Sequence, residues 1–155
     1  MNDPILVKHA RGAPGLRILG IGPCFIPLKG IEKLQNLFNE NTSWAKKRSK
    51  NSIKQMLSKS DIVVTLWQKK EIIGFGRATS DETFRAVLWD VVVDKKYQNC
   101  GLGKKIVNSI LNNSRVKNVE IVYLMTTYCE QFYNNIGFIN EKKIKLLSLK
   151  KNERK

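Results

Sequence analysis

The stretch Val91-Val-Val-Asp-Lys-Lys-Tyr-Gln-Asn-Cys-Gly-Leu-Gly-Lys104 decides how this sequence folds. It begins with three β-branched apolar residues, which are typical of a buried strand. After Gly103, apolar side chains recur at helical spacing, at Ile106, Val107, Ile110 and Leu111. The stretch therefore predicts a strand that runs into a helix through a short loop.

The two glycines of this loop, Gly101 and Gly103, favour an anion-binding site. Glycine adopts positive φ and lets the backbone approach a ligand closely. Free N–H groups at the start of a helix point toward one spot, where the helix dipole adds positive charge. Lys104 and Lys105 add more, so we expect residues 98–104 to bind a pyrophosphate. The Walker pattern and the complete dinucleotide fingerprint are absent, which excludes both kinds of nucleotide loop.

The rest of the chain contains both strand-like segments, which are β-branched and apolar, and segments with apolar side chains at helical spacing. Three strands before the loop are joined by short turns and predict an antiparallel meander. The expected elements are strands over 18–26, 61–67, 72–79, 84–94 and 119–125, helices over 31–38, 45–58, 103–113 and 130–135, and one or two closing strands over 138–149.

Length and charge limit the classes of protein that fit. The chain has 155 residues, 42% of them hydrophobic, and a formal net charge of +15. This length predicts one domain, over 18–149, with an irregular lead-in over 1–17 and a basic tail over 150–155. No apolar run is long enough to span a membrane, so we expect no membrane partner. Three cysteines and one histidine give neither a metal site nor a disulfide framework, which favours a reducing compartment.

Two motifs resemble those of the GNAT superfamily of acetyl-CoA-dependent N-acetyltransferases. Val93, Gln98, Gly101 and Gly103 resemble its V-x-P-x-x-[QR]-x-x-G-x-[GA] signature, and Phe132-Tyr-Asn-Asn-Ile-Gly-Phe138 resembles its F-Y-x-x-x-G-F element. The resemblance spans about residues 31–140, and Lys95 stands where the signature usually has proline.

A narrower resemblance points to a plastid and cyanobacterial branch. Residues 74–81 and 88–94 are similar to the branch that includes the plant serotonin N-acetyltransferases, also described as plastid protein-lysine acetyltransferases. It implies the plastid stroma or the cyanobacterial cytoplasm as the location of the protein. The superfamily resemblance implies an α/β (α+β) fold with a mixed, mostly antiparallel sheet of about six to seven strands and about four helices.

The resemblance also implies a cofactor site. The backbone of Val91 and Val93 would pair with the pantetheine amides, since a strand that splays from its neighbour leaves polar groups unpaired. The expected cofactor-binding residues are Val91, Val92, Val93, Gln98, Asn99, Cys100, Gly101, Leu102, Gly103 and Lys104. We expect acetyl-CoA as co-substrate and no metal.

Acetyl transfer to an amine needs two proton movements. The ammonium must lose a proton, and the departing thiolate must gain one. The resemblance makes Tyr133 the acid, and we choose Asp90 as the base. A bulge in residues 88–93 would decide which way Asp90 points and could turn an N–H toward the thioester oxygen. Asp81 and Glu82 are rival carboxylates that would attract the cationic amine.

Two classes of acetyl acceptor fit the sequence: a small amine, such as an arylalkylamine, and a protein lysine. Residues 41–60 carry six basic side chains and no acidic one, so a basic nucleic-acid-binding module is an alternative function. A catalytically silent CoA-binding regulator is another. The resemblance is also compatible with a homodimer.

Overall fold

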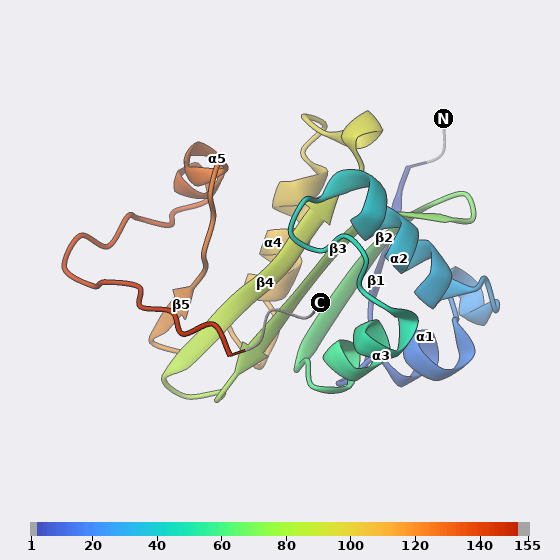
Figure 1. Cartoon of the computed structure of the whole chain (residues 1–155), viewed down its shortest axis with the longest axis horizontal. Helices are drawn as coiled ribbons and strands as arrows, with labels where there is room; N and C mark the ends of the chain where they lie inside the picture. Colours follow the sequence, from blue (N-terminus) through green and yellow to red (C-terminus); the bar gives the residue numbers. More distant parts are fainter. Residues whose placement is uncertain (1–2, 152–155) are drawn as a thin grey trace. The chain divides into compact units, whose positions relative to one another are not determined.

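The computed structural model describes residues 3–151 and contains a five-stranded sheet (Figure 1). Its strands are β1 (Ile5–Lys8), β2 (Ile62–Gln68), β3 (Glu71–Ser80), β4 (Arg85–Val93) and β5 (Ile121–Tyr123). They lie in sequence order. Neighbours pair antiparallel except β4 and β5, which are parallel. The expected mixed, mostly antiparallel sheet is confirmed, with fewer strands than the six or seven predicted.

Five α-helices and two short 3₁₀ helices accompany the sheet. They are α1 (Pro14–Leu19), η1 (Pro23–Phe25), α2 (Gly30–Asn41), α3 (Lys50–Ser58), η2 (Lys95–Tyr97), α4 (Leu102–Leu111) and α5 (Glu130–Asn134). The chain divides into two compact units at Met125, and the second contains α5. No helix within residues 3–151 has the length and hydrophobicity needed to cross a membrane.

Helices α1–α3 cover one face of the sheet. Leu34 and Phe38 of α2 are fully buried there, together with Phe75 of β3. The Phe38 and Phe75 rings meet edge to face, with centroids 5.4 Å apart. Val92 of β4 belongs to the same apolar cluster. The end of β4 is therefore fixed against the helical layer.

Helix α4 packs on the opposite face, behind the sheet in Figure 1. Ile106 and Ile110 of this helix are fully buried. A Cβ on Gly76 would lie 2.6 Å from Ile106 Cγ2 and 3.0 Å from Ile110 Cδ1. Glycine in β3 thus lets α4 approach the sheet closely, which places the start of the helix beside the end of β4.

The strand expected over 18–26 is wrong. Pro14 occupies the first turn of a helix, where proline is favoured, and Gly20 ends that helix at φ +62°. Only an isolated bridge between Ile21 and Pro27 is strand-like in this region. The lead-in is not irregular either, because residues 5–8 pair with β2.

Two further expectations differ from the structure. The helix expected over 45–58 begins only at Lys50, because Ser49 caps it through a hydrogen bond from Ser52 N–H at 3.1 Å. No closing strand forms within residues 138–151, where apolar side chains such as Leu147 and Leu149 are exposed. Residues 1–2 of the lead-in and 152–155 of the basic tail lie outside the described residues.

Candidate functional site

The loop between β4 and α4 is held by its own side chains. Asp94 accepts a hydrogen bond from the Lys96 N–H, and the Gln98 side-chain amide donates to the Val93 carbonyl at 3.0 Å. Asn99 and Gly101 adopt positive φ, +61° and +77°. A Cβ on Gly101 would meet nothing within 4 Å, so its backbone conformation and not crowding is what requires glycine there.

The backbone N–H groups of residues 99–104 are free to bind a ligand. Within residues 3–151 none of them donates a hydrogen bond, and the first internal donor is Lys105, to the Gly101 carbonyl at 3.0 Å. Residues 99–101 are also exposed. These donors stand at the N-terminus of a ten-residue helix, where the helix dipole favours negative charge. The loop therefore has the geometry of an anion receptor.

The edge of β4 beside this loop is also unpaired. β5 pairs only with residues 85–87 of β4, so within residues 3–151 no strand pairs with the side of residues 88–93 that faces away from β3. Asp94 N–H donates to the Ile73 carbonyl of β3 at 2.8 Å. Because backbone groups alternate along a strand, Val92 also faces β3, whereas Val91 and Val93 face outward. The outward Val93 carbonyl already accepts the hydrogen bond from the Gln98 side chain. An extended ligand backbone could pair with the groups that remain.

A bulge interrupts β4 next to this free edge. Trp89 pairs with Arg77 and Val92 with Phe75, so Asp90 and Val91 together lie opposite a single β3 residue. Asp90 has φ +50°, a left-handed conformation that aspartate tolerates better than most residues. A bulge is therefore present within residues 88–93, where it decides which way Asp90 points.

The bulge turns the Asp90 side chain toward the face that carries α2 and α3. Arg77 Nε donates to Asp90 Oδ2 at 2.6 Å, and Arg48 Nη2 donates to Asp90 Oδ1 at 3.3 Å. The Asp90 side chain is only 8% exposed, and both of its oxygens accept from guanidinium groups. Sequence reasoning missed both arginines, since no spacing rule links a residue of the α2–α3 connection to a strand 42 positions later.

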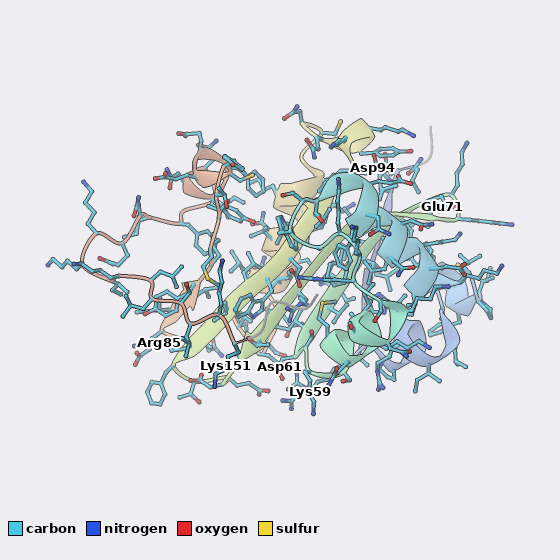
Figure 2. The ribbon with its side chains drawn as sticks, in the orientation of Figure 1. Lys59, Asp61, Glu71, Arg85, Asp94 and Lys151 are labelled. Atoms are coloured by element: carbon cyan, nitrogen blue, oxygen red, sulfur yellow. The ribbon has the colours of Figure 1, made fainter. Side chains whose placement is uncertain are left out.

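Asp81 and Glu82 lie in the turn at the other end of β4. Asp81 Oδ1 accepts from the backbone N–H groups of Thr83, Phe84 and Arg85, which lowers the pKa of Asp81. Glu82 pairs with Arg115. Figure 2 shows Arg85 and Asp94 at opposite ends of the strand. The structure thus gives Asp81 partners within the turn and Glu82 a partner from the segment after α4. It does not bring either carboxylate to the bulge, and their contact with a substrate stays a prediction.

Tyr133 lies in the second unit, on α5. Its ring packs edge to face against Phe132 and Phe138, with centroids 4.9 and 5.7 Å away. Burial raises the pKa of the Tyr133 hydroxyl to about 12, and the neighbouring Cys129 adds to the effect. The hydroxyl therefore stays protonated at neutral pH, as a proton or hydrogen-bond donor must.

Comparisons with a family model and with known proteins all point to the same family. A model described as "Acetyltransferase (GNAT) domain" matches residues 32–145. An "Uncharacterized N-acetyltransferase ycf52" from Pyropia yezoensis is 34% identical over 110 residues, which are 66% of this chain and 61% of that protein. A ycf52-like protein from Prochlorococcus marinus is 32% identical over 109 residues, 67% of this chain and 60% of its own length.

A plant relative is similar over a shorter stretch. The "GCN5-related N-acetyltransferase 2, chloroplastic" of Arabidopsis thaliana is 40% identical over 72 residues, 46% of this chain and 28% of that protein. This chain thus spans about three fifths of the length of the Pyropia relative and less of the plant one.

Solved structures share the fold. A GNAT family acetyltransferase from Streptococcus pneumoniae superposes with a TM-score of 0.70 at 17% identity, over 99% of this chain and all of that one. A probable acetyltransferase from Staphylococcus aureus gives a TM-score of 0.66 at 25% identity, over 77% of this chain and 92% of the other.

Proposed function

Because this chain belongs to the GNAT family of acetyltransferases, we propose that it transfers an acetyl group from acetyl-CoA to a primary amine. The supporting observation is the run of free backbone N–H groups at residues 99–104, which continues directly from the free edge of β4. Pyrophosphate oxygens are acceptors only, so they match a site made of donors. Pantetheine carries two amides and can pair with a strand edge as a peptide does.

The residues of β4 would hold the reacting end of acetyl-CoA. The outward groups of Val91 and the outward N–H of Val93 would bind the pantetheine amides, since Gln98 already donates to the Val93 carbonyl. Residues 98–104, including Asn99, Cys100 and Leu102, would surround the pyrophosphate. Lys104 adds a positive charge in the first turn of α4. Val92 faces the apolar cluster and would fix the strand without touching the ligand.

The reaction itself is a direct transfer. The amine nitrogen, once neutral, attacks the thioester carbonyl carbon, and negative charge develops on the carbonyl oxygen. A backbone N–H freed by the bulge would donate to that oxygen, which is worth several kcal/mol in known oxyanion sites. The carbon–sulfur bond then breaks, the thiolate takes a proton, and the amide product loses the second proton of the former ammonium.

Two side chains are the candidates for these proton movements. Asp90 would accept the proton of the ammonium through a water molecule, because both of its oxygens already accept from Arg48 and Arg77. The Tyr133 hydroxyl, protonated at neutral pH, would donate to the leaving sulfur. Asp90 thus acts as a base only if a water reaches it beside the two guanidinium groups.

The proposal covers the class of acceptor, the compartment and the assembly of the protein. An arylalkylamine and a protein lysine each present a primary amine, and either fits the reaction. The relatives from Arabidopsis, named as chloroplastic, and from Prochlorococcus support a plastid stroma or a cyanobacterial cytoplasm. A homodimer is compatible with the family.

Calorimetric titration with acetyl-CoA tests the proposal. We expect saturable binding, and at 100 times Kd the fold should gain about 2.7 kcal/mol of stability. The Gly103→Glu variant should lose binding, because its carboxylate occupies the place of a phosphate. An acidic residue in the first turn of a helix is otherwise stabilising, so the loss would not reflect unfolding.

Asn112→Glu is the matched control, since it adds the same carboxylate at the other end of α4. It should bind acetyl-CoA like the unmodified protein. Absence of binding by the unmodified protein would refute the proposal. Binding without acetyl transfer to any primary amine would instead indicate the silent regulator.

A further inference from the structure

The connection between α2 and α3, residues 42–49, is tied to the bulge of β4. Arg48 pairs with Asp90, and its guanidinium lies over the rings of Phe38 and Trp44, 5.4 Å from each centroid. The Gln35 side chain donates to the Arg48 carbonyl at 2.9 Å. This connection therefore holds a fixed position beside the strand on which acetyl transfer is proposed (Figure 1).

The same region carries a concentration of positive charge. Four lysines, at positions 46, 47, 50 and 54, are exposed. Of these four lysines, only Lys50 has an acidic partner within the described part of the chain, Glu32 at 3.4 Å. Lys50 and Lys54 are four residues apart on α3, so they lie on one side of the helix, about 6 Å apart along its axis.

Trp44 adds an apolar contact to this surface. The side chain is 55% exposed, although Arg48 lies over its ring and Phe38 contacts it with centroids 6.5 Å apart. An indole that is already held in place loses little conformational entropy on binding, which is the property of an interface anchor. We call Trp44, Lys46, Lys47, Lys50 and Lys54 the basic docking surface.

We propose that the basic docking surface binds an acidic polypeptide segment, and that a lysine in or next to this segment is the acetyl acceptor. The inference rests on the proposed acetyl transfer and names its substrate class. In an extended peptide, side chains two residues apart lie about 6.6 Å apart on one side. Carboxylates with that spacing match the separation of Lys50 and Lys54 along the helix.

Other anionic or amine-bearing ligands fit this surface less well. A free arylalkylamine is a cation without an anionic group, so the lysines would repel it. A nucleic acid has the required phosphates but carries no alkyl primary amine for the proposed reaction. A polypeptide supplies both the carboxylates and the amine on one chain, and it is long enough to span several lysines.

Three peptides of equal length test the inference. Each carries one lysine, flanked by glutamate and aspartate, by serine and alanine, or by arginine. We expect kcat/KM for the acidic peptide to exceed that for the neutral one at least tenfold at low salt. The advantage should shrink as ionic strength rises, because screening weakens attraction between exposed charges. Fluorescence anisotropy of the labelled peptides should give the same order of affinity without depending on turnover.

A charge reversal provides the matched comparison. The double variant Lys46→Glu/Lys47→Glu should lose the preference for the acidic peptide and keep its affinity for acetyl-CoA. The control, Lys69→Glu/Lys117→Glu, changes the net charge equally at exposed positions elsewhere. Each pair also includes one lysine with positive φ, Lys47 at +64° and Lys69 at +55°. The control should keep the preference.

Several results would overturn the inference. Equal kcat/KM and equal affinity for the three peptides would do so, as would the same loss in both double variants. Salt-dependent binding of duplex DNA or RNA that displaces the acidic peptide, and that Lys46→Glu/Lys47→Glu removes, would assign the surface to nucleic acid instead. If acetyl-CoA fails to bind, the proposed function falls as well; if acetyl-CoA binds and peptide preference is absent, only this inference falls.

Discussion

Arg77 of β3 and Asp90 of β4 form a close ion pair across the bulge, with Nε and Oδ2 2.6 Å apart. Arg48, from the connection before α3, binds the same carboxylate from the other side at 3.3 Å. The Asp90 side chain is 8% exposed, and those of Arg77 and Arg48 are 15% and 31% exposed. One carboxylate therefore joins the sheet to the helical layer at the point where acetyl transfer is proposed.

Asp90→Asn should lower both stability and activity. Asparagine tolerates positive φ as aspartate does, so the backbone of the bulge is kept and only the charge is lost. Two guanidinium groups would then face each other without an anion between them. We expect a loss of about 2 kcal/mol, less than for a fully buried pair because the arginines are partly exposed. Urea denaturation measures this loss.

The pH dependence of kcat distinguishes the base from a purely structural residue. If Asp90 accepts the proton of the amine, Asp90→Asn should lower kcat by about 10²–10⁴ and change the shape of the profile. Arg77→Gln also breaks the ion pair but keeps the carboxylate, so it serves as the control. Equal losses of kcat in both variants, with unchanged profiles, would assign Asp90 to positioning alone.

Gly76→Ala should destabilise the fold by about 1–3 kcal/mol, as overpacking does in a dense core. The new Cβ would lie 2.6 Å from Ile106 Cγ2, and α4 would have to move away from β3. Gly101→Ala is the comparison, since open space surrounds that position and only its φ of +77° opposes the change. Thermal unfolding should show the larger loss for Gly76→Ala, and the reverse order would contradict the close approach of α4.

The sequence predicted the meander, α2, α4 and the glycine loop because each has a local signal. The β-branched and apolar runs within residues 61–94, separated by short turns, and the apolar positions of residues 102–111 report burial directly. The loop is recognisable because Gly101 and Gly103 stand between a β-branched run and a helical apolar pattern. The place of Asp90 before the cofactor-pairing valines makes it a candidate base, but alternation alone leaves the direction of its side chain to a bulge that the sequence does not mark.

The remaining features depend on contacts between distant residues. β1 has only four residues and forms because β2 offers an edge. The ion pairs of Asp90 join residues 42 and 13 positions away, and no pattern in the sequence marks Arg48 or Arg77 as its partners. Residues 138–149 carry enough apolar side chains to suggest a strand, yet apolar side chains alone do not create a pairing partner.

Tyr133→Phe should lower kcat about 10- to 100-fold while leaving the affinity for acetyl-CoA unchanged. The variant keeps the ring contacts with Phe132 and Phe138 and removes only the hydroxyl. Since the pKa of Tyr133 is raised to about 12, the hydroxyl should not titrate in assays between pH 6 and about 10. An unchanged kcat would remove Tyr133 from the mechanism without affecting the cofactor loop.

The raised pKa of Tyr133 can be measured separately. The pKa of Tyr133 in the folded chain, about 12, exceeds the usual tyrosine value of 10.0, so its stabilising effect is complete below pH 10 and is lost between about 10 and 12. Absorbance at 295 nm follows the ionisation of the four tyrosines. The step near pH 12 should disappear in Tyr133→Phe, and its persistence would assign it to another tyrosine.

His9, the one histidine of the chain, directly follows β1 and joins a partly buried hydrogen-bond network with β2. Its Nε2 is 2.8 Å from Thr65 Oγ1, and the Trp67 indole donates to the same oxygen at 2.8 Å. Because the indole is a donor only, the Thr65 hydroxyl keeps its own hydrogen and can donate it to an unprotonated His9 Nε2. A neutral His9 with its ring hydrogen on Nδ1 fits this network.

Acidification should weaken the fold through His9. Burial lowers the pKa of His9 from 6.5 to about 4, so the unfolded chain binds the proton first. The stabilising effect is complete above pH 6.5 and is lost as the pH falls toward 4, by at most about 3 kcal/mol. Urea denaturation from pH 7.5 to 4.5 should show this decline, and His9→Gln should flatten it. A single imidazole signal in the NMR spectrum that titrates near pH 6.5 in the folded protein would contradict the buried, neutral histidine.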